Sequence, residues 1–479
     1  MSYEIRADYS RSWLFPPHLE DWVAADHPAR FLREFVEALD LAAAGFHGRS
    51  SADGRPNFAA DLLLKVWLFG YVNGIRSLRK LERACRENVG LLWLTGLNAP
   101  DHNTLWRFWR DHRAALRQVF TLVVRTAVEA ELVGVGLHAI DGTKVLAQGS
   151  KERVRTREQI EAALARLEDG VDEVMGQIEA AAEVDPEGEG YRLPDDWRQR
   201  MLRREQLREL AAECEINDRQ TIQEVEPEAR FMKTRREGTA LAYNAQSVVD
   251  ADSGLMVAAD VIAEGNDNHG LVAMLDQVAD TVGHAAEATV ADAGYYSGEQ
   301  LQQAEERGYG VLVNERRDDV ASEEKAAKAY DSARFRYDQE RDCCVCPRGT
   351  ELAFAGIKSM GLGKGGEQVR RYRCTQFAAC PVRSQCSQDP KGRTVSIGRF
   401  HGPMTRNREK CQAADNQRVL RKRKVIAEPP YGLIKEIMHF RRFTVMGLEQ
   451  VRVQWSLVCS AFNLRKLYPH WRSGRLRFA

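Results

Sequence analysis

The sequence contains no uninterrupted run of about eighteen apolar residues, the length that a membrane-spanning helix requires. Its first residues, MSYEIRADYS, lack the basic stretch followed by an apolar stretch that is typical of a secretory signal. These absences argue against a membrane protein and against a secreted one. We therefore expect a soluble intracellular protein.

Neither sign of charge is in excess, since 69 Lys and Arg balance 69 Asp and Glu. The charges are nevertheless unevenly placed: nine acidic and no basic residues lie between Glu168 and Gly190, whereas residues 401–479 carry seventeen Lys or Arg against five Asp or Glu. Such a basic end attracts phosphate backbones. A solvated basic face is the alternative, so charge alone does not establish DNA binding.

The chain of 479 residues is too long for one ordinary core, so we expect two or three packed units or one domain with large insertions. Residues 12–130 have apolar residues at helical spacing and predict a helical N-terminal domain over 1–130. Residues 151–225 contain two charged helical stretches separated by EVDPEGEG. We interpret them as an antiparallel helical hairpin inserted into a sheet.

Strands and helices then alternate in an order that favours a mixed α/β sheet. VGVGLHAIDGTKV predicts a strand that ends at Asp141 before a Gly-containing turn, and two further strands follow the hairpin over 239–262. A helix, the strand EATVADAG, a helix and the strand YGVLVN complete the pattern. Three adjoining strands followed by helix and strand in alternation is the order of the ribonuclease H fold, although other α/β sheets have it too.

Three carboxylates stand where such a sheet presents functional groups. Asp141 and Asp292 each follow an apolar run and precede a Gly closely, so both are expected at the carboxyl ends of strands. The alternative for either one alone is a turn or cap residue. Glu428 precedes Pro429 and Pro430, which suit a first helical turn, so the helix dipole would keep Glu428 ionised for a cation such as Mg²⁺. Lys435, two turns later, would lie on the same side and could contact a phosphate.

Taken together, the segments AIDGTKV, VADAGYYS and AEPPYGLIK resemble the Asp, Asp and Glu motifs of bacterial insertion-sequence transposases with a DDE triad on a ribonuclease H-like fold. LFPPHLEDWVAADHPARFLREFVEAL and the helices after it resemble the N-terminal helical domain of these proteins, so the resemblance spans nearly the whole chain. In many relatives the Glu motif contains a Tyr and an Arg, where this chain has Arg421 and Lys424.

The resemblance implies an α/β ribonuclease H-like catalytic domain over 131–320 and 400–479, interrupted by the hairpin and by a Cys-rich module over 330–400. It implies that Asp141, Asp292 and Glu428 hold two Mg²⁺ ions about 3.5 to 4 Å apart, for which Mn²⁺ can substitute, and that they support cleavage and joining of double-stranded DNA. Synapsis of two element ends implies a homodimer, and the location would be the cytoplasm, at the nucleoid. The predicted DNA contacts are Arg421, Lys424, Lys435, Arg441 and Arg442.

Six of the ten cysteines lie within residues 343–386. The set Cys346, Cys374, Cys380 and Cys386 would suit tetrahedral structural zinc in a zinc-ribbon-like module, although Cys343 or Cys344 could substitute and reduced core thiols are the alternative. Four thiolates would leave no open position for water, which argues against a zinc hydrolase.

Three further interpretations remain open. In GNDNHG, Asp267 and His269 could bind a metal, but a helix cap is the preferred interpretation. GLGKGG at 361–366 resembles a phosphate loop only superficially and is interpreted as a loop tip. A non-catalytic DNA-binding protein, either a decayed transposase or a regulator, is the alternative function.

Overall fold

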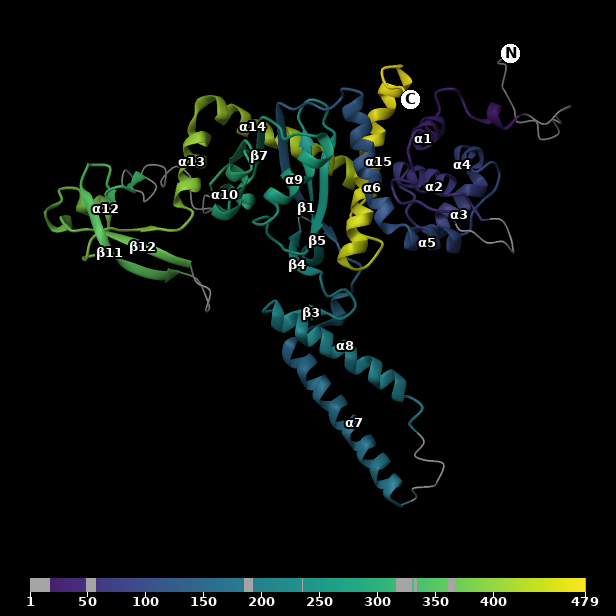
Figure 1. Ribbon diagram of the computed structural model, residues 1–479, viewed down its shortest axis with the longest axis horizontal. Helices are drawn as coiled ribbons and strands as arrows, with labels where there is room; N and C mark the ends of the chain where they lie inside the picture. The colour runs from purple at the N-terminus through teal and green to yellow at the C-terminus, as the bar shows by residue number, and fades with distance from the viewer. Residues whose placement is uncertain are drawn as a thin grey trace, which may run out of the picture.

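The computed structural model describes residues 18–48, 57–184, 193–234, 236–315, 330, 334–360 and 367–478. The Gly-rich segment 361–366 lies outside these residues. Figure 1 shows four parts: an N-terminal helical bundle, a central sheet covered by helices, a helical pair that projects from it, and a small antiparallel sheet on the side away from the bundle. No helix among these residues combines the length and the apolar character needed to cross a bilayer.

The central sheet joins antiparallel and parallel strands. Its order is β4-β5-β1-β7-β8, with β6 also paired to β5; β5 is antiparallel to β1, β4 and β6, whereas β1, β7 and β8 are parallel. This mixed α/β arrangement agrees with the ribonuclease H-like domain predicted from the sequence. The strands are β1 (Leu137–Leu146), β4 (Arg230–Thr234), β5 (Gly238–Asp250), β6 (Met256–Ile262), β7 (Ala288–Ala291) and β8 (Val311–Val313).

Strand β1 is longer than the sequence predicts. The expected turn at Gly142 is absent, and the strand continues to Leu146. The physical reason is its pairing with β5, which continues past Asp141 (opposite Ser247) and Gly142 (opposite Gln246). An Asp-Gly pair that favours a turn locally is thus held extended by a neighbouring strand.

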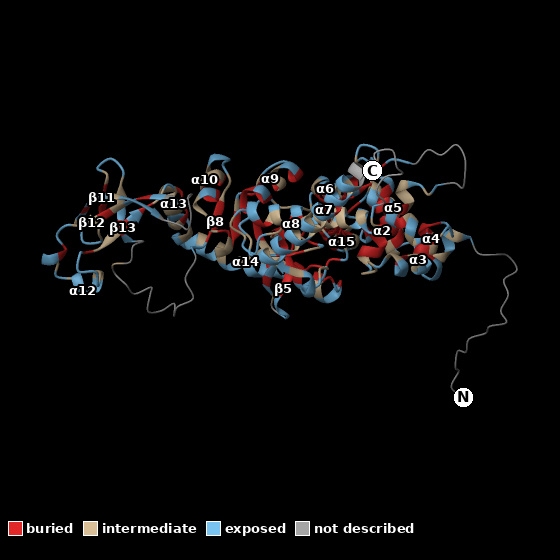
Figure 2. Cartoon of the chain, turned by 90° about the horizontal axis from the view of Figure 1, so that it is seen from below, coloured by how far each residue is buried: buried red, intermediate tan, exposed pale blue. Residues whose placement is uncertain are grey.

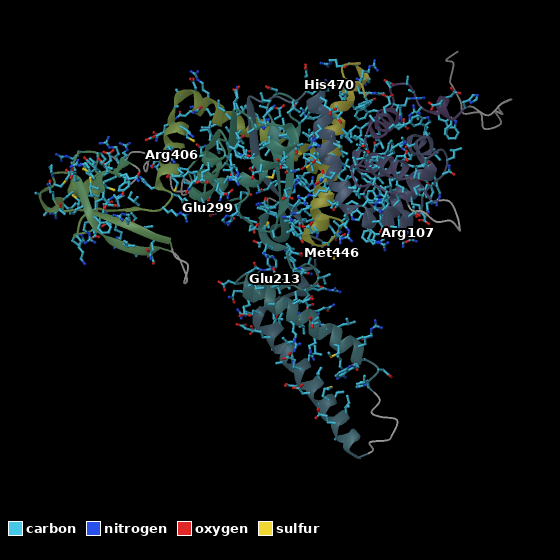
Figure 3. All side chains as sticks on the ribbon, viewed as in Figure 1. Arg107, Glu213, Glu299, Arg406, Met446 and His470 are labelled. Carbon is cyan, nitrogen blue, oxygen red and sulfur yellow. The ribbon has the colours of Figure 1, made fainter. Side chains whose placement is uncertain are left out.

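Helices cover both faces of this sheet. On one face, α14 packs against β1 and β7, and Ala427 forms a small core with Ala139, Val290 and Leu312. The helix α15 packs on β6 and on α6, and Met446 and His470, labelled in Figure 3, mark its two ends. The covering helices are α9 (Leu271–Val282), α10 (Gly298–Glu306), α13 (His401–Gln412), α14 (Ala414–Gly432) and α15 (Leu448–Arg472).

The N-terminal bundle shares one continuous hydrophobic core with the central sheet. Its local signals are clear: Pro28 occupies the first turn of α1, and the Asp101 carboxylate caps α5 by accepting the Thr104 N–H at 2.6 Å. Figure 2 shows that buried residues lie inside both the bundle and the central sheet region. The helices are η1 (Leu19–Trp22), α1 (Pro28–Glu37), α2 (Ala60–Val72), α3 (Leu78–Glu87), α4 (Val89–Leu94), α5 (His102–Asp111) and α6 (Arg113–Glu129).

Two insertions extend from the central sheet. The first consists of two helices that pack on each other, α7 (Arg157–Val184) and α8 (Trp197–Ile216). At their base, β2 (Val154–Thr156) pairs with β3 (Thr221–Gln223), and the short helix η2 (Lys151–Arg153) comes directly before β2. It has its own core of Ile160, Leu207, Leu210, Cys214 and Ile222. In Figure 1 it projects away from the rest of the chain.

The second insertion is a five-stranded antiparallel sheet of order β13-β12-β11-β10-β9. Its core is small and contains Cys344, Leu352 and the fully buried Tyr372. Arg406 on α13, labelled in Figure 3, pairs with Glu305 of α10 at 2.6 Å where the chain returns to the central sheet. The elements are β9 (Arg336–Asp338), β10 (Cys343–Val345), β11 (Glu351–Met360), β12 (Glu367–Cys374), η5 (Phe377–Ala379), α12 (Arg383–Cys386) and β13 (Thr394–Ile397).

Candidate active site

Two of the three predicted catalytic carboxylates lie on neighbouring parallel strands. β1 and β7 pair with Leu137 opposite Ala288 and Ala139 opposite Val290. Continued by two residues, past the end of β7 at Ala291, this register would set Asp141 opposite Asp292, and the two carboxylates do interact electrostatically. Neighbouring strands are about 4.8 Å apart, so the two side chains emerge side by side.

Asp141 is held by contacts from β1 itself and from α14. Its Oδ1 accepts the Gly142 N–H at 2.8 Å, its Oδ2 lies 3.1 Å from Nη1 of Arg423, and its backbone carbonyl accepts the Tyr431 hydroxyl at 2.5 Å. The pKa of Asp141 is raised to about 6: burial is the largest cause and the nearby Asp292 carboxylate acts in the same direction, whereas Arg423 and the Gly142 N–H lower it. Asp141 is therefore a partly buried carboxylate whose charge is only partly compensated.

Asp292 lies where the sequence predicts it, directly after β7. It is the N-cap residue of the short helix η3 (Ala293–Tyr295), and its Oδ1 accepts the Gly294 N–H at 2.8 Å. The cap does not exclude the predicted catalytic role, because the Gly294 N–H occupies only one oxygen of the Asp292 carboxylate.

Glu428 does not stand at a helix start, so that prediction is wrong. It is exposed in the last turns of α14, and Pro429 and Pro430 lie inside the helix, directly before a π-helical turn, η6 (Leu433–Ile437). The helix continues into the proline pair because Ala427 and Pro430 are buried against neighbouring elements. A helix C-terminus carries negative partial charge, so the predicted dipole effect on Glu428 has the opposite sign.

The structure thus brings Asp141 and Asp292 together and leaves Glu428 on the exposed side of α14. Across the described ranges, no three His, Cys, Asp or Glu side chains are grouped closely enough to hold a metal ion. On a helix, Glu428 neighbours Tyr431 and Lys424, three and four residues away. Tyr431 touches the backbone of Asp141, which puts Glu428 at the border of the same site.

Two family models match the chain. Residues 345–468 match a transposase DDE domain, and residues 17–111 match a transposase domain (DUF772). Both matches support an insertion-sequence transposase of the DDE class. The matched segments include Glu428 and the basic helix α14, whereas Asp141 and Asp292 lie between them. No curated protein matches the chain.

The basic residues predicted to contact DNA fall into two groups in the structure. Arg421 and Lys424 are exposed on α14. The other three are engaged within the protein: Lys435 donates to the Thr143 hydroxyl at 2.5 Å, Arg441 pairs with Glu436, and Arg442 donates to the Ala147 carbonyl. Lys435 thus anchors η6 to β1 rather than extending into solvent.

Sequence reasoning missed Arg423 and Tyr431, and for Asp267 it preferred a helix cap to a role in the site. Arg423 is one of four consecutive basic residues in RKRKV. Only the packing of α14 decides which of these side chains faces the sheet and contacts Asp141. Asp267 does not cap α9 with its side chain, because the N-cap is Gly270; its carboxylate instead accepts hydrogen bonds from Asn244 and Gln246. His269 is exposed. The GNDNHG motif was the available signal for Asp267.

The four thiols of the predicted zinc set interact electrostatically in the small sheet, but among the described residues they are not grouped closely enough to form a metal site. Burial raises the pKa of Cys374, and the thiols of Cys346 and Cys380 add to that effect; Cys386 is influenced in the same way by the other three. Cys346 Sγ accepts backbone N–H groups of Arg348 at 3.4 Å and Thr350 at 3.3 Å. All four are free thiols.

Proposed function

We propose that this transposase catalyses magnesium-dependent DNA strand cleavage at the ends of an insertion sequence and transfer of the freed strand into target DNA. The observation that carries the proposal is the register of β1 and β7, which sets Asp141 opposite Asp292. Family membership implies DNA as the substrate. The test is incubation of the purified protein with a DNA that carries the inverted repeats flanking its gene, with Mg²⁺ or with a chelator.

The residues present fit a hard divalent cation. Asp141 and Asp292 supply carboxylate oxygens, the ligand type that Mg²⁺ prefers, and their mutual repulsion is relieved by a cation. Within the described chain, the buried Tyr295 hydroxyl has no hydrogen-bond partner, and burial and the carboxylates of Asp267, Asp141 and Asp292 raise its pKa. When bound, two such ions activate an attacking oxygen and stabilise a leaving oxygen.

The chain's own residues prepare this site. The Tyr431 hydroxyl donates to the backbone carbonyl of Asp141 and is also hydrogen-bonded to the Ser247 hydroxyl at 2.8 Å. This one side chain therefore connects α14 to both β1 and β5. Arg423 supplies a positive charge beside Asp141. The backbone N–H groups of Gly142 and Gly294 orient one oxygen of each carboxylate. The second oxygen of Asp292 is left for a ligand, and the second oxygen of Asp141 also accepts from Arg423.

We also propose Glu428 as the third carboxylate of the triad. Glu428→Gln removes the charge, keeps the side-chain volume and, because the residue is exposed, is expected to leave the fold unchanged. We expect strand cleavage to fall by about tenfold or more, while binding of DNA carrying the element's ends is unchanged. A gel assay of cleavage, with filter binding of the same DNA, measures both. Wild-type cleavage by Glu428→Gln would remove Glu428 from the triad.

For DNA binding we propose the helical bundle within residues 1–130 and the exposed cations Arg421 and Lys424 on α14. Lys435, Arg441 and Arg442 can contribute only if DNA replaces their present partners. Because two element ends must be held together for joining, we propose a homodimer as the active form. If the protein binds end sequences but does not cleave them with Mg²⁺, a non-catalytic DNA-binding role replaces the proposed enzyme.

Finally, we propose that Cys346, Cys374, Cys380 and Cys386 hold structural zinc. Four cysteine sulfurs are the ligands that a tetrahedral structural Zn²⁺ prefers, two backbone N–H groups donate hydrogen bonds to Cys346 Sγ, and the module's own hydrophobic core is small. Purified protein should contain near-stoichiometric zinc by mass spectrometry, and Cys380→Ser should lose it and unfold the module at lower temperature. Cys411→Ser, at a cysteine outside the small sheet, is the matched control. Zinc-free wild-type protein would contradict the proposal.

A further inference from the structure

Asp267 lies between the two glycines that follow the two catalytic aspartates. A Cβ added at Gly142 would stand 2.9 Å from Asp267 Oδ1, and a Cβ added at Gly294 would stand 2.9 Å from Asp267 Oδ2. The Cβ at Gly294 would also stand 2.8 Å from Asp292 Oδ1. Asp267 Oδ2 and Asp292 Oδ1 therefore both lie beside the same point at Gly294, which is too close to them to admit a methyl group.

One oxygen of Asp267 is fixed by buried donors. Asn244 Nδ2 and Gln246 Nε2, both from β5, donate to Oδ1 at 2.5 and 3.0 Å, and the Lys144 ammonium lies 3.8 Å from the same oxygen. Asn244 is 0% exposed and Gln246 is 1% exposed. Donors this deeply buried fix the orientation of the carboxylate, and its other oxygen, Oδ2, lies on the side of Gly294 and Asp292.

A second observation points to a missing ligand in the same place. The Tyr295 hydroxyl and Asn244 Oδ1 are buried and, within the described chain, have no hydrogen-bond partner. Both lie around the position that a Gly142 Cβ would occupy, at 3.6 Å and 2.8 Å from it. Unsatisfied buried oxygens beside carboxylates indicate a site for a hydrated cation, whose water ligands donate hydrogen bonds.

We infer that Asp267 is a fourth carboxylate of the cation site, where its Oδ2 and Asp292 bind the same divalent ion. The inference rests on the proposed metal-dependent function and adds a ligand from the loop before α9. A purely structural role for Asp267, as counter-ion of Lys144 and acceptor for two amides, is the competing explanation. That role uses only Oδ1, so the two explanations differ in what they require of Oδ2.

Asp267→Asn separates them, because the Asn side chain keeps one oxygen to accept both amides and replaces only the other with a group that cannot bind a cation. Binding of Mn²⁺ alone is measured by titration calorimetry and by the electron paramagnetic resonance of free Mn²⁺. We expect the affinity to fall at least tenfold. Asp280→Asn, an exposed carboxylate at the far end of α9, is the matched control and should bind as wild type. Wild-type affinity in Asp267→Asn overturns the inference.

A measurement on the unaltered protein covers the case in which Asp267→Asn fails to fold. Fe²⁺ with ascorbate and peroxide cleaves backbone next to its ligands, so the wild type should be cut near residues 141, 267 and 292, and excess Mn²⁺ should suppress the cuts. Cuts near 141 and 292 alone would also overturn the inference. Neither readout needs DNA cleavage, so a wild type that binds Mn²⁺ through Asp267 but cleaves no DNA would refute the proposed function only.

Discussion

Asp141→Asn and Asp292→Asn are each expected to abolish DNA strand cleavage while leaving binding to the element's ends intact. Each exchange keeps the side-chain volume and the acceptor oxygen that the Gly142 or Gly294 N–H uses, and removes the negative charge. A cation in such a site contributes several kcal/mol of transition-state stabilisation, and each 1.36 kcal/mol is a factor of ten, so we expect a fall of about 10³-fold or more. Single-turnover cleavage of labelled end DNA measures the rate.

The control must show that loss of activity is not loss of the fold. Asp260→Asn is suitable: Asp260 lies on the neighbouring strand β6 and contacts Arg117 at 3.1 Å and Arg452 at 3.3 Å on covering helices, outside the proposed site. This variant loses ion pairs but should retain cleavage. Cleavage within about tenfold of wild type by Asp141→Asn or Asp292→Asn would remove that residue from the site.

The position of Asp292 could be predicted because its signals are local. A short β-branched and apolar run, a carboxylate and a nearby Gly predict a strand end wherever the chain folds, and β7 ends there. The alternation of strands and helices likewise predicted the mixed sheet. That Asp141 stands opposite Asp292 could not be predicted from either motif, because it depends on the register between strands about 150 residues apart.

The errors arose where tertiary packing overrides a local preference. Asp-Gly favours a turn, but β5 pairs with Asp141 and Gly142 and keeps β1 extended. Glu-Pro-Pro is typical of a helix start, but Ala427 is already buried in α14 before the prolines, so the helix begins at Ala414. Asp267 lies in a motif typical of caps, yet its partners come from a strand about twenty residues earlier.

Trp455→Ala is expected to cause the largest loss of stability, about 3 to 5 kcal/mol in the free energy of unfolding. Trp455 on α15 is fully buried, and its indole N–H donates to the Gln246 carbonyl of β5 at 3.0 Å. Its ring lies 6.4 Å from Tyr431 and 6.2 Å from Phe440, centroid to centroid. Alanine would leave a cavity where α15, β5 and the end of α14 meet, together with a buried carbonyl without its donor.

Urea unfolding followed by circular dichroism measures this loss, and Trp106→Ala provides the control for the same change of residue at a position that is 41% exposed. The control should shift stability by less than about 1 kcal/mol. Because the lost hydrogen bond belongs to Gln246, whose side chain holds Asp267, folded Trp455→Ala protein should also bind Mn²⁺ more weakly. If Trp455→Ala and Trp106→Ala lost equal amounts of stability and of Mn²⁺ affinity, α15 would not support the site through this contact.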